Sequence, residues 1–347
     1  MGLTMKITDA GVRKIGEALD KLMTVDISAR GSIAVLYEAA RAQQEDSLSY
    51  SSIQLLKKSI KPGDYVFIVT GWADQYWNVP HFGESDGPPG AVALARSLRI
   101  AFQALPIIVT DDYLVEGMKK IVNGSGMHCS PPDNLAASID SSRGFACVPT
   151  AAVIPFPQDA QTGELEAARL IEFYKPAMCI SIERGGMNEL GRIHGMGGFD
   201  YTDSQGKLDY LFLEATRRGI TTMGIGDGGN EIGMANIAET IREKVNHGVK
   251  IVPSTKVDLL VPATISNWGG YAISCLLAAS TGELDAMVAE DIEDRVLKAC
   301  ADADFHDTIG ATNMPSVDGC RAPIHLALIK LMRESVMQGM RRHSVDS

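Results

Sequence analysis

The sequence Met-Gly-Ile-Gly-Asp-Gly-Gly-Asn-Glu-Ile-Gly occupies residues 223–233 and joins a predicted strand to a predicted helix. Residues 219–225 are mostly β-branched or apolar, which is typical of a short buried strand, and residues 231–245 repeat apolar side chains at helical spacing. Glycines at such a junction let a ligand approach the backbone closely. Because Asp227, Asn230 and Glu231 belong to the same turn, we expect a ligand-binding loop here.

Residues 224–229 also satisfy the dinucleotide-binding pattern G-x-G-x-x-G. A pyrophosphate there would be repelled by Asp227 and Glu231, no acidic residue ends the next predicted strand (257–261), and the chain has no G-K-[ST] phosphate loop. The acidic loop is better suited to a divalent metal, an ammonium group or a proton transfer. The plain alternative is a tight turn in which Asp227 or Asn230 caps the helix and Glu231 interacts favourably with its dipole.

The composition indicates an ordinary globular protein. The 347 residues are 45% hydrophobic and 22% charged, and the formal net charge is −11. So acidic a chain argues against nucleic acid or an anionic membrane surface as a partner, although a locally basic pocket can still accept an anionic substrate.

The six cysteines are scattered without a C-x-x-C pair, which argues against a zinc site and against a disulfide framework. Reduced thiols are typical of the cytosol. The first residues contain no apolar signal segment, and no run of residues is long enough to span a bilayer. We therefore expect a cytoplasmic protein without a membrane segment.

Predicted strands and helices alternate through the middle of the chain. This alternation indicates an α/β fold, with a mostly parallel sheet covered by helices on both faces in three layers. We expect one catalytic domain over residues 1–347, in which the helical segment 1–62 forms a lid, an oligomer surface or ordinary packing. The predicted strands are 65–69, 106–111, 151–155, 177–182, 219–225 and 257–261, and residues 72–90 are predicted to form a long loop without regular structure.

Four of these strands end in polar, glycine-containing loops, which begin at Thr70, Glu183, Gly226 and Thr264. In a parallel sheet these loops share the edge at which α/β folds bind ligands. Helices that begin near residues 231 and 266 would add backbone N–H donors for an anion. The site predicted from these loops contains Glu183, Arg184, Asp227, Asn230, Glu231, Ser266 and Asn267. Carboxylates beside an arginine favour a small amino acid or carboxylic acid over a nucleotide.

Residues 224–234, with Glu183-Arg184 before them and Asn267-Trp268-Gly269 after them, resemble the D-glutamate cyclase family. Arg30-Gly31, Thr70-Gly71, residues 87–91 and residues 317–319 are similar to further landmarks of that family, so the resemblance covers nearly the whole chain. Ala235 departs from the pattern, because a glycine is expected there. Mitochondrial family members in animals resemble this chain over their C-terminal part, which implies a free-standing form here.

The resemblance implies conversion of D-glutamate to 5-oxo-D-proline and water, or the reverse. It places Asp227 or Glu231 at the amine, Glu183 in proton transfer, and Arg184 or Arg30 at the α-carboxylate. The side-chain carboxyl of the substrate would be polarised by Asn230 and by the N–H groups of the glycine loop. The remaining substrate-binding positions are Thr70, Gly71, Gly226, Gly228, Gly229, Ser266 and Asn267. No organic cofactor is implied, whereas a divalent ion (Mg or Mn) at Asp227 and Glu231 is compatible with the loop.

Three other functions remain open at this point. The first is another lyase or hydrolase activity on a small amino or hydroxy acid, which would need the same types of residue. A non-catalytic amino-acid-binding protein on the same sheet is another alternative, and a nucleotide-dependent oxidoreductase is the third. The expected partner is a small molecule, and the sequence also leaves room for a homo-oligomer.

Overall fold

The computed structural model describes residues 7–76, 79–139 and 148–344. Its main sheet has seven strands in the order β5-β6-β4-β1-β7-β8-β9, and all neighbouring strands are parallel. The strands are β1 Tyr65–Val69, β4 Leu105–Asp111, β5 His128–Cys129, β6 Thr150–Phe156, β7 Met178–Ile182, β8 Thr221–Gly226 and β9 Leu259–Pro262. The predicted α/β class and parallel sheet are therefore confirmed.

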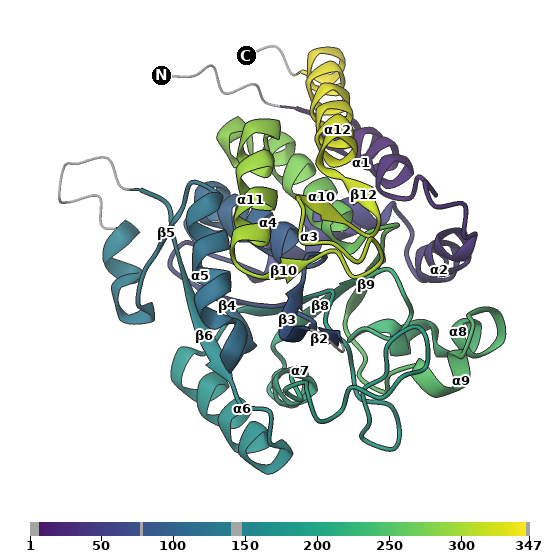
Figure 1. Ribbon diagram of the computed structural model, residues 1–347. Coiled ribbons are helices and arrows are strands. Elements are labelled where there is room, and N and C mark those ends of the chain that lie inside the picture. The colour runs from purple at the N-terminus through teal and green to yellow at the C-terminus, as the bar shows by residue number, and fades with distance from the viewer. Residues whose placement is uncertain (1–6, 77–78, 140–147, 345–347) are drawn as a thin grey trace.

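Helices cover both faces of this sheet. They are α1 Asp9–Met23, α2 Ser32–Arg41, α3 Leu48–Ser59, α4 Pro88–Phe102, α5 Val115–Gly124, α6 Ala160–Tyr174, α7 Asp209–Arg217, α8 Ala238–Lys244, α9 Gly248–Ile251, α10 Ser266–Thr281, α11 Glu290–Asp302 and α12 Ala322–His343. Figure 1 shows α3, α4 and α10 on one side of the sheet and α6 and α7 on the other. No helix in the described part of the chain is long and apolar enough to cross a membrane.

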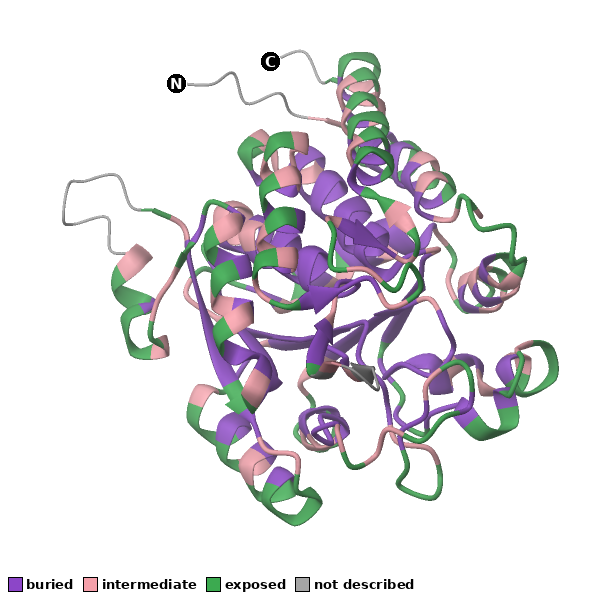
Figure 2. Ribbon diagram, viewed as in Figure 1, coloured by how far each residue is buried: buried purple, intermediate pink, exposed green. Residues whose placement is uncertain are grey.

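Helix α10 lies at the centre of the upper layer. Every residue from Ser266 to Ala279 is buried, because α10 packs against α4 on one side and against α1 and α3 on the other. Figure 2 shows this continuous buried region through the sheet, α4 and α10, with exposed residues on the outer helices. Helices α1 and α3 are thus packed on α10, whereas α2 packs against β9 and α8. The predicted function of the N-terminal segment as a lid or an oligomer surface stays a prediction.

The order of the strands reverses between β1 and β7. Strands β4, β6 and β5 lie on one side of β1, whereas β8 and β9 lie beyond β7 on the other side. In open α/β sheets, ligands bind outside the carboxyl ends of the strands at such a reversal. The loops after Val69 and Ile182 begin at this point.

Two local predictions are wrong. The expected loop 72–90 contains β2 Ala73–Tyr76 and β3 Val79–Glu84, which pair with each other. Strand β3 also pairs with β10 Phe305–His306. Strand β10 lies more than 200 residues after β3 in the chain, so no local pattern reveals their pairing.

The helix expected from residue 231 is the second wrong prediction. A short 3-10 helix, Met234–Ile237, precedes α8 instead. Gly233 has a left-handed backbone (φ 103°), and this conformation is incompatible with the interior of an α-helix.

Candidate functional site

A cavity of about 300 Å³ opens at the reversal point of the sheet. It is lined by Arg30, Trp72, Asp74, Glu84, Glu183, Gly195, Met196, Gly197, Phe199, Tyr201, Asp227, Asn230, Thr308, Ile309 and Asp318. Three predicted residues from two separate loops, Glu183 after β7 and Asp227 and Asn230 after β8, therefore share one cavity, and Arg30 joins them from the loop between α1 and α2. The cavity has the volume of a small-molecule site.

Glu183 follows β7 directly and has a left-handed backbone, with φ 44°. A non-glycine residue with this conformation is uncommon and costs free energy, so it points to a constraint at this position. The Glu183 side chain is only 8% exposed, and its Oε2 accepts a hydrogen bond from the Ser266 hydroxyl. Burial, and then the nearby carboxylates of Glu231 and Asp86, raise the pKa of Glu183 well above its usual value.

Asp227 lies in the loop after β8 and is partly exposed to the cavity. Burial raises its pKa well above the usual value, and the negative charges of Glu183 and Asp318 raise it further. The two acidic groups in this small cavity therefore both bind a proton more tightly than a free carboxyl does. Such an arrangement is suited to proton transfer near neutral pH.

Asp86 completes a group of three carboxylates with Glu183 and Asp227. One oxygen atom from each lies within 4.8 Å of the others. Carboxylate oxygens are the preferred ligands of Mg²⁺ and Mn²⁺, so these three residues have the chemistry of a divalent-ion site. The sequence predicted Asp227 and Glu231 as the metal pair. The structure instead groups Asp227 with Asp86 and Glu183, so Glu231 is replaced in the candidate ligand set.

Glu231 organises the glycine loop from within. Its carboxylate accepts hydrogen bonds from the backbone nitrogens of Asp227 (2.6 Å), Gly228 (2.5 Å) and Gly229 (2.7 Å). It is fully buried and does not line the cavity. The predicted assignment of Glu231 to the amine or to a metal therefore does not fit its contacts.

The glycines of this loop serve the same internal contacts. The N–H groups of Gly228 and Gly229 point at Glu231, so they are not free to polarise a substrate carboxyl. A Cβ atom at Gly226 would lie 2.8 Å from the Glu231 carboxyl carbon. The glycines thus allow the loop to close around a buried carboxylate, and this close packing explains their spacing.

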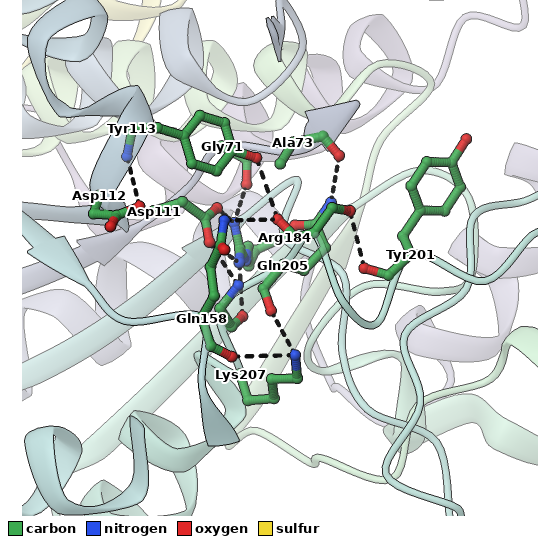
Figure 3. Close-up of polar contacts among 12 residues, drawn as sticks. Gly71, Ala73, Asp111, Asp112, Tyr113, Gln158, Arg184, Tyr201, Gln205 and Lys207 are labelled. Carbon is green, nitrogen blue, oxygen red and sulfur yellow. Dashed lines mark hydrogen bonds and ion pairs between the residues drawn. The ribbon is translucent and has the colours of Figure 1, made fainter. Parts of the chain in front are cut away.

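Arg184 is the largest departure from the predicted site. It is fully buried and forms an ion pair with Asp111, and its guanidinium also donates to the carbonyls of Gly71 and Gly206. Figure 3 shows Arg184 with Asp111 and Gly71 beside it. Because both of its Nη atoms are occupied in this way, Arg184 holds the ends of β1 and β4 and the residue 206 loop together rather than a substrate carboxylate. Gly71 contributes a carbonyl to this network, and the buried Thr70 is not part of the cavity wall.

Lys207 extends the same network. Its ammonium group donates to the carbonyls of Gln158, Thr202 and Gln205, and the Gln205 amide donates to the Ala73 carbonyl. Figure 3 shows Lys207 below Arg184 and Ala73 above it. The network therefore supports the loop that carries Met196 and Tyr201 into the cavity.

The N-terminus of α10 is capped by Asp86 rather than open to a ligand. Its carboxylate accepts from the backbone nitrogens of Ser266 and Asn267, both at 2.9 Å, a favourable position for a negative charge. The Asn267 side-chain oxygen accepts from Gly87 (3.0 Å) and Gly90 (2.7 Å). The predicted substrate-binding role of Asn267 is therefore corrected to a bridge between α10 and α4. Ser266 reaches the cavity only through Glu183.

Four acidic residues of the site were not predicted from the sequence: Asp74, Glu84, Asp86 and Asp318. Burial and the charge of Asp318 raise the pKa of Glu84, and burial raises the pKa of Asp318 against a lowering hydrogen bond from Asp227. Asp318 also has a left-handed backbone, with φ 53°. Its segment, residues 317–319, carried a signal as a family landmark, but nothing in the sequence indicates which segments meet it.

Comparison with known proteins identifies a family for this chain. The family model "D-glutamate cyclase-like, C-terminal" matches residues 19–333. The human protein "D-glutamate cyclase, mitochondrial" is 29% identical over 242 residues, which cover 65% of this chain and 34% of the human protein. The chain thus spans about a third of the length of this curated relative.

Proposed function

The chain belongs to the D-glutamate cyclase-like family, and from this premise we propose that it interconverts D-glutamate and 5-oxo-D-proline plus water. The observation that carries the proposal is the cavity itself. It places two carboxyls with raised pKa, Glu183 and Asp227, in the same small space as the guanidinium of Arg30. A zwitterionic amino acid offers an ammonium group to the two carboxyls and a carboxylate to the guanidinium of Arg30.

Recognition of the substrate follows from the charges along the wall. Arg30 binds the α-carboxylate, because a guanidinium can donate two parallel hydrogen bonds to this group. The ammonium group lies against Asp227 and Asp318 at the acidic end. Trp72 and Tyr201, whose rings meet edge-to-face with centroids 5.1 Å apart, close one side of the cavity against water.

The reaction requires the nitrogen to lose two protons and the departing oxygen to gain two. Asp227 takes a proton from the ammonium group, and the neutral amine attacks the carbon of the side-chain carboxyl. As the C–N bond forms, Glu183 protonates one oxygen of that carboxyl, and Asp227 returns its proton to Glu183. Asp227 then takes the second proton from the nitrogen, Glu183 gives a second proton to the same oxygen, and the bond from carbon to that oxygen breaks so that it leaves as water. Proton exchange between the neighbouring carboxyls restores both groups. The raised pKa of each carboxyl brings its proton affinity closer to the working pH.

A divalent ion, Mg²⁺ or Mn²⁺, forms a second part of the proposal. Asp86, Glu183 and Asp227 would hold it, because their oxygens are close together and none of the three is paired with a cationic side chain in the described hydrogen bonds and ion pairs. Such an ion would supply positive charge to polarise the substrate carboxyl. The protein residues would still bind the α-carboxylate and exclude water.

A chiral assay tests the proposed function. The protein is incubated separately with D-glutamate, L-glutamate and 5-oxoproline, and the products are resolved by chiral chromatography. We expect D-glutamate and 5-oxo-D-proline to interconvert while L-glutamate is left unchanged. Stoichiometric binding of an amino acid with no product over hours would contradict the proposal and favour a binding protein. Turnover of a different small acid would favour another lyase or hydrolase.

We also propose a cytoplasmic location. The support is that the five described cysteines, Cys129, Cys179, Cys275, Cys300 and Cys320, are all free thiols, which is usual in a reducing compartment. Localisation of a tagged full-length chain by fractionation tests this, and recovery from an oxidising compartment would contradict it.

A further inference from the structure

Arg30 lies on the exposed loop between α1 and α2. Among the described residues that line the cavity, it is the only one with a cationic side chain. It is close enough to Asp318 to lower the pKa of that carboxyl. An arginine at the surface has many rotamers, and binding a ligand requires most of them to be given up. The conformation of this loop therefore decides how much of the arginine is already in place before a carboxylate arrives.

Asp26 fixes the backbone on both sides of this arginine. One carboxylate oxygen accepts from the Arg30 nitrogen at 3.1 Å, and the other accepts from the Gly31 nitrogen at 2.7 Å. The Asp26 carbonyl also accepts from the Ala29 nitrogen at 3.2 Å. These contacts hold a sharp reversal in which Ala29 (φ 54°) and Gly31 (φ 75°) are both left-handed. The bonds with Gly31 and Arg30 also keep the pKa of Asp26 below its usual value.

We propose that Asp26 is a positioning residue that orients Arg30 toward the cavity for the substrate carboxylate. This inference rests on the proposed function of the same site and deepens it. Asp26 does not line the cavity, so its effect on a ligand passes through Arg30. The α-carboxylate takes no part in bond formation. Loss of its contact with Arg30 therefore weakens binding of the substrate and of the transition state equally, and the effect appears in KM rather than in kcat.

A double-mutant cycle tests the proposal. The wild-type protein is compared with Asp26→Ala, Arg30→Ala and the double variant, with D-glutamate as substrate. We expect Asp26→Ala to raise KM about tenfold with kcat within about twofold, as for a lost contact with a charged group. Arg30→Ala raises KM at least as much, and the double variant has the KM of Arg30→Ala alone.

Asp159→Ala is the matched control. Asp159 is an exposed aspartate that caps α6 by accepting from the Thr162 nitrogen at 2.8 Å, so its removal costs a similar loop contact at a residue that does not line the cavity. We expect unchanged KM for this control. Asp26→Asn keeps one acceptor oxygen and should give an intermediate KM. Additive effects of Asp26→Ala and Arg30→Ala, or a loss in kcat with unchanged KM, would overturn the proposal.

Binding of glutarate separates this inference from the proposed function, because glutarate has both carboxylates of glutamate and no amine. Calorimetry is performed with the same four proteins. If the wild type has no turnover but binds glutarate with the same non-additive losses, the proposed reaction fails and the role of Asp26 stands. If D-glutamate is turned over and Asp26→Ala affects neither KM nor glutarate affinity, the reaction stands and the role of Asp26 fails. Absence of both turnover and glutarate binding overturns both.

Discussion

Two buried groups of charged residues lie at the carboxyl ends of the sheet strands, and they solve the problem of buried charge in opposite ways. In one group, Arg184 and Asp111 are both fully buried and form an ion pair, and backbone carbonyls satisfy further donors of the arginine. At the cavity, Asp86, Glu183 and Asp227 gather like charges with no cationic side chain among the three. A compensated pair supports the fold, whereas uncompensated carboxyls cost stability, and such a cost is typical of a functional site.

The sharpest test of this contrast is Asp227→Asn. The change removes a proton acceptor and keeps the side-chain size, so we expect turnover of D-glutamate to fall about a thousandfold. The melting temperature should stay equal or rise, because one like charge is removed from the cluster. Initial rates and thermal unfolding measure the two effects. Asp133→Asn, an exposed aspartate in a distant short helix, is the control and should change neither. Unchanged turnover in Asp227→Asn would remove the loop from the mechanism.

Arg184→Met is expected to lower stability, in contrast to Asp227→Asn. The substitution leaves the fully buried Asp111 without its cation, so the free energy of unfolding should fall by about 3–5 kcal/mol. Arg192→Met is the matched control, because Arg192 pairs with Asp200 at the surface, where their side chains are 58% and 35% exposed. Its cost should stay below about 1 kcal/mol. Denaturant unfolding compares the two, and equal losses would show that burial does not decide the role of the Arg184 pair.

Binding of Mn²⁺ or Mg²⁺ sharpens the other side of the comparison. An ion that bridges Asp86, Glu183 and Asp227 would turn the uncompensated cluster into a compensated one. At a concentration of about a hundred times Kd, it should stabilise the protein by about 2.7 kcal/mol. Thermal unfolding after treatment with a chelator and re-addition of metal measures the effect, and Asp227→Asn should weaken it. No shift with either ion in the wild type would contradict the metal part of the proposal.

The sequence predicted the carboxylates of the cavity better than the buried pair of Arg184 and Asp111. Strand patterns are local, and the carboxyl ends of parallel strands must share an edge, so Glu183, Asp227 and Asn230 could be placed together from the residues alone. The sequence could not show that Glu231 turns inward, because that depends on which backbone nitrogens surround it in the folded loop. Arg184 was placed at the right edge but faces Asp111, a partner 73 residues away.

The missed carboxylates have a different cause. Glu84 is the last residue of β3 and Asp86 follows it, and Asp318 lies in the hairpin of β11 (Ser316–Val317) and β12 (Cys320–Arg321). These segments meet through the β3–β10 pairing and through a bond from the Ser85 hydroxyl to the Ser316 carbonyl. Both contacts join residues more than 200 positions apart. Periodicity cannot reveal such contacts, since each of these segments is short and has no apolar pattern of its own.

Glu293 extends the comparison to another buried carboxyl, which forms no ion pair in the described part of the chain and does not line the candidate cavity. It is 1% exposed and accepts a hydrogen bond from the Tyr271 hydroxyl at 2.5 Å. Burial raises its pKa from the usual 4.5 to about 8. The folded protein therefore keeps a proton that the unfolded chain loses, and the stability from this group is fully present below about pH 4.5 and declines as the pH rises toward about 8. Across two pH units inside this window, the loss should be about 2 kcal/mol.

Glu293→Gln should remove this dependence while its side-chain oxygen still accepts from Tyr271. We expect the variant and the wild type to differ little in stability near pH 5 and the variant to be more stable at pH 7.5, as measured by denaturant unfolding at both values. Turnover should not change, because Glu293 does not line the cavity. The same pH profile in both proteins would mean that Glu293 is ionised in the fold. Burial alone would then not raise a carboxyl pKa in this protein, and the raised values at Glu183 and Asp227 would have to come from their mutual repulsion.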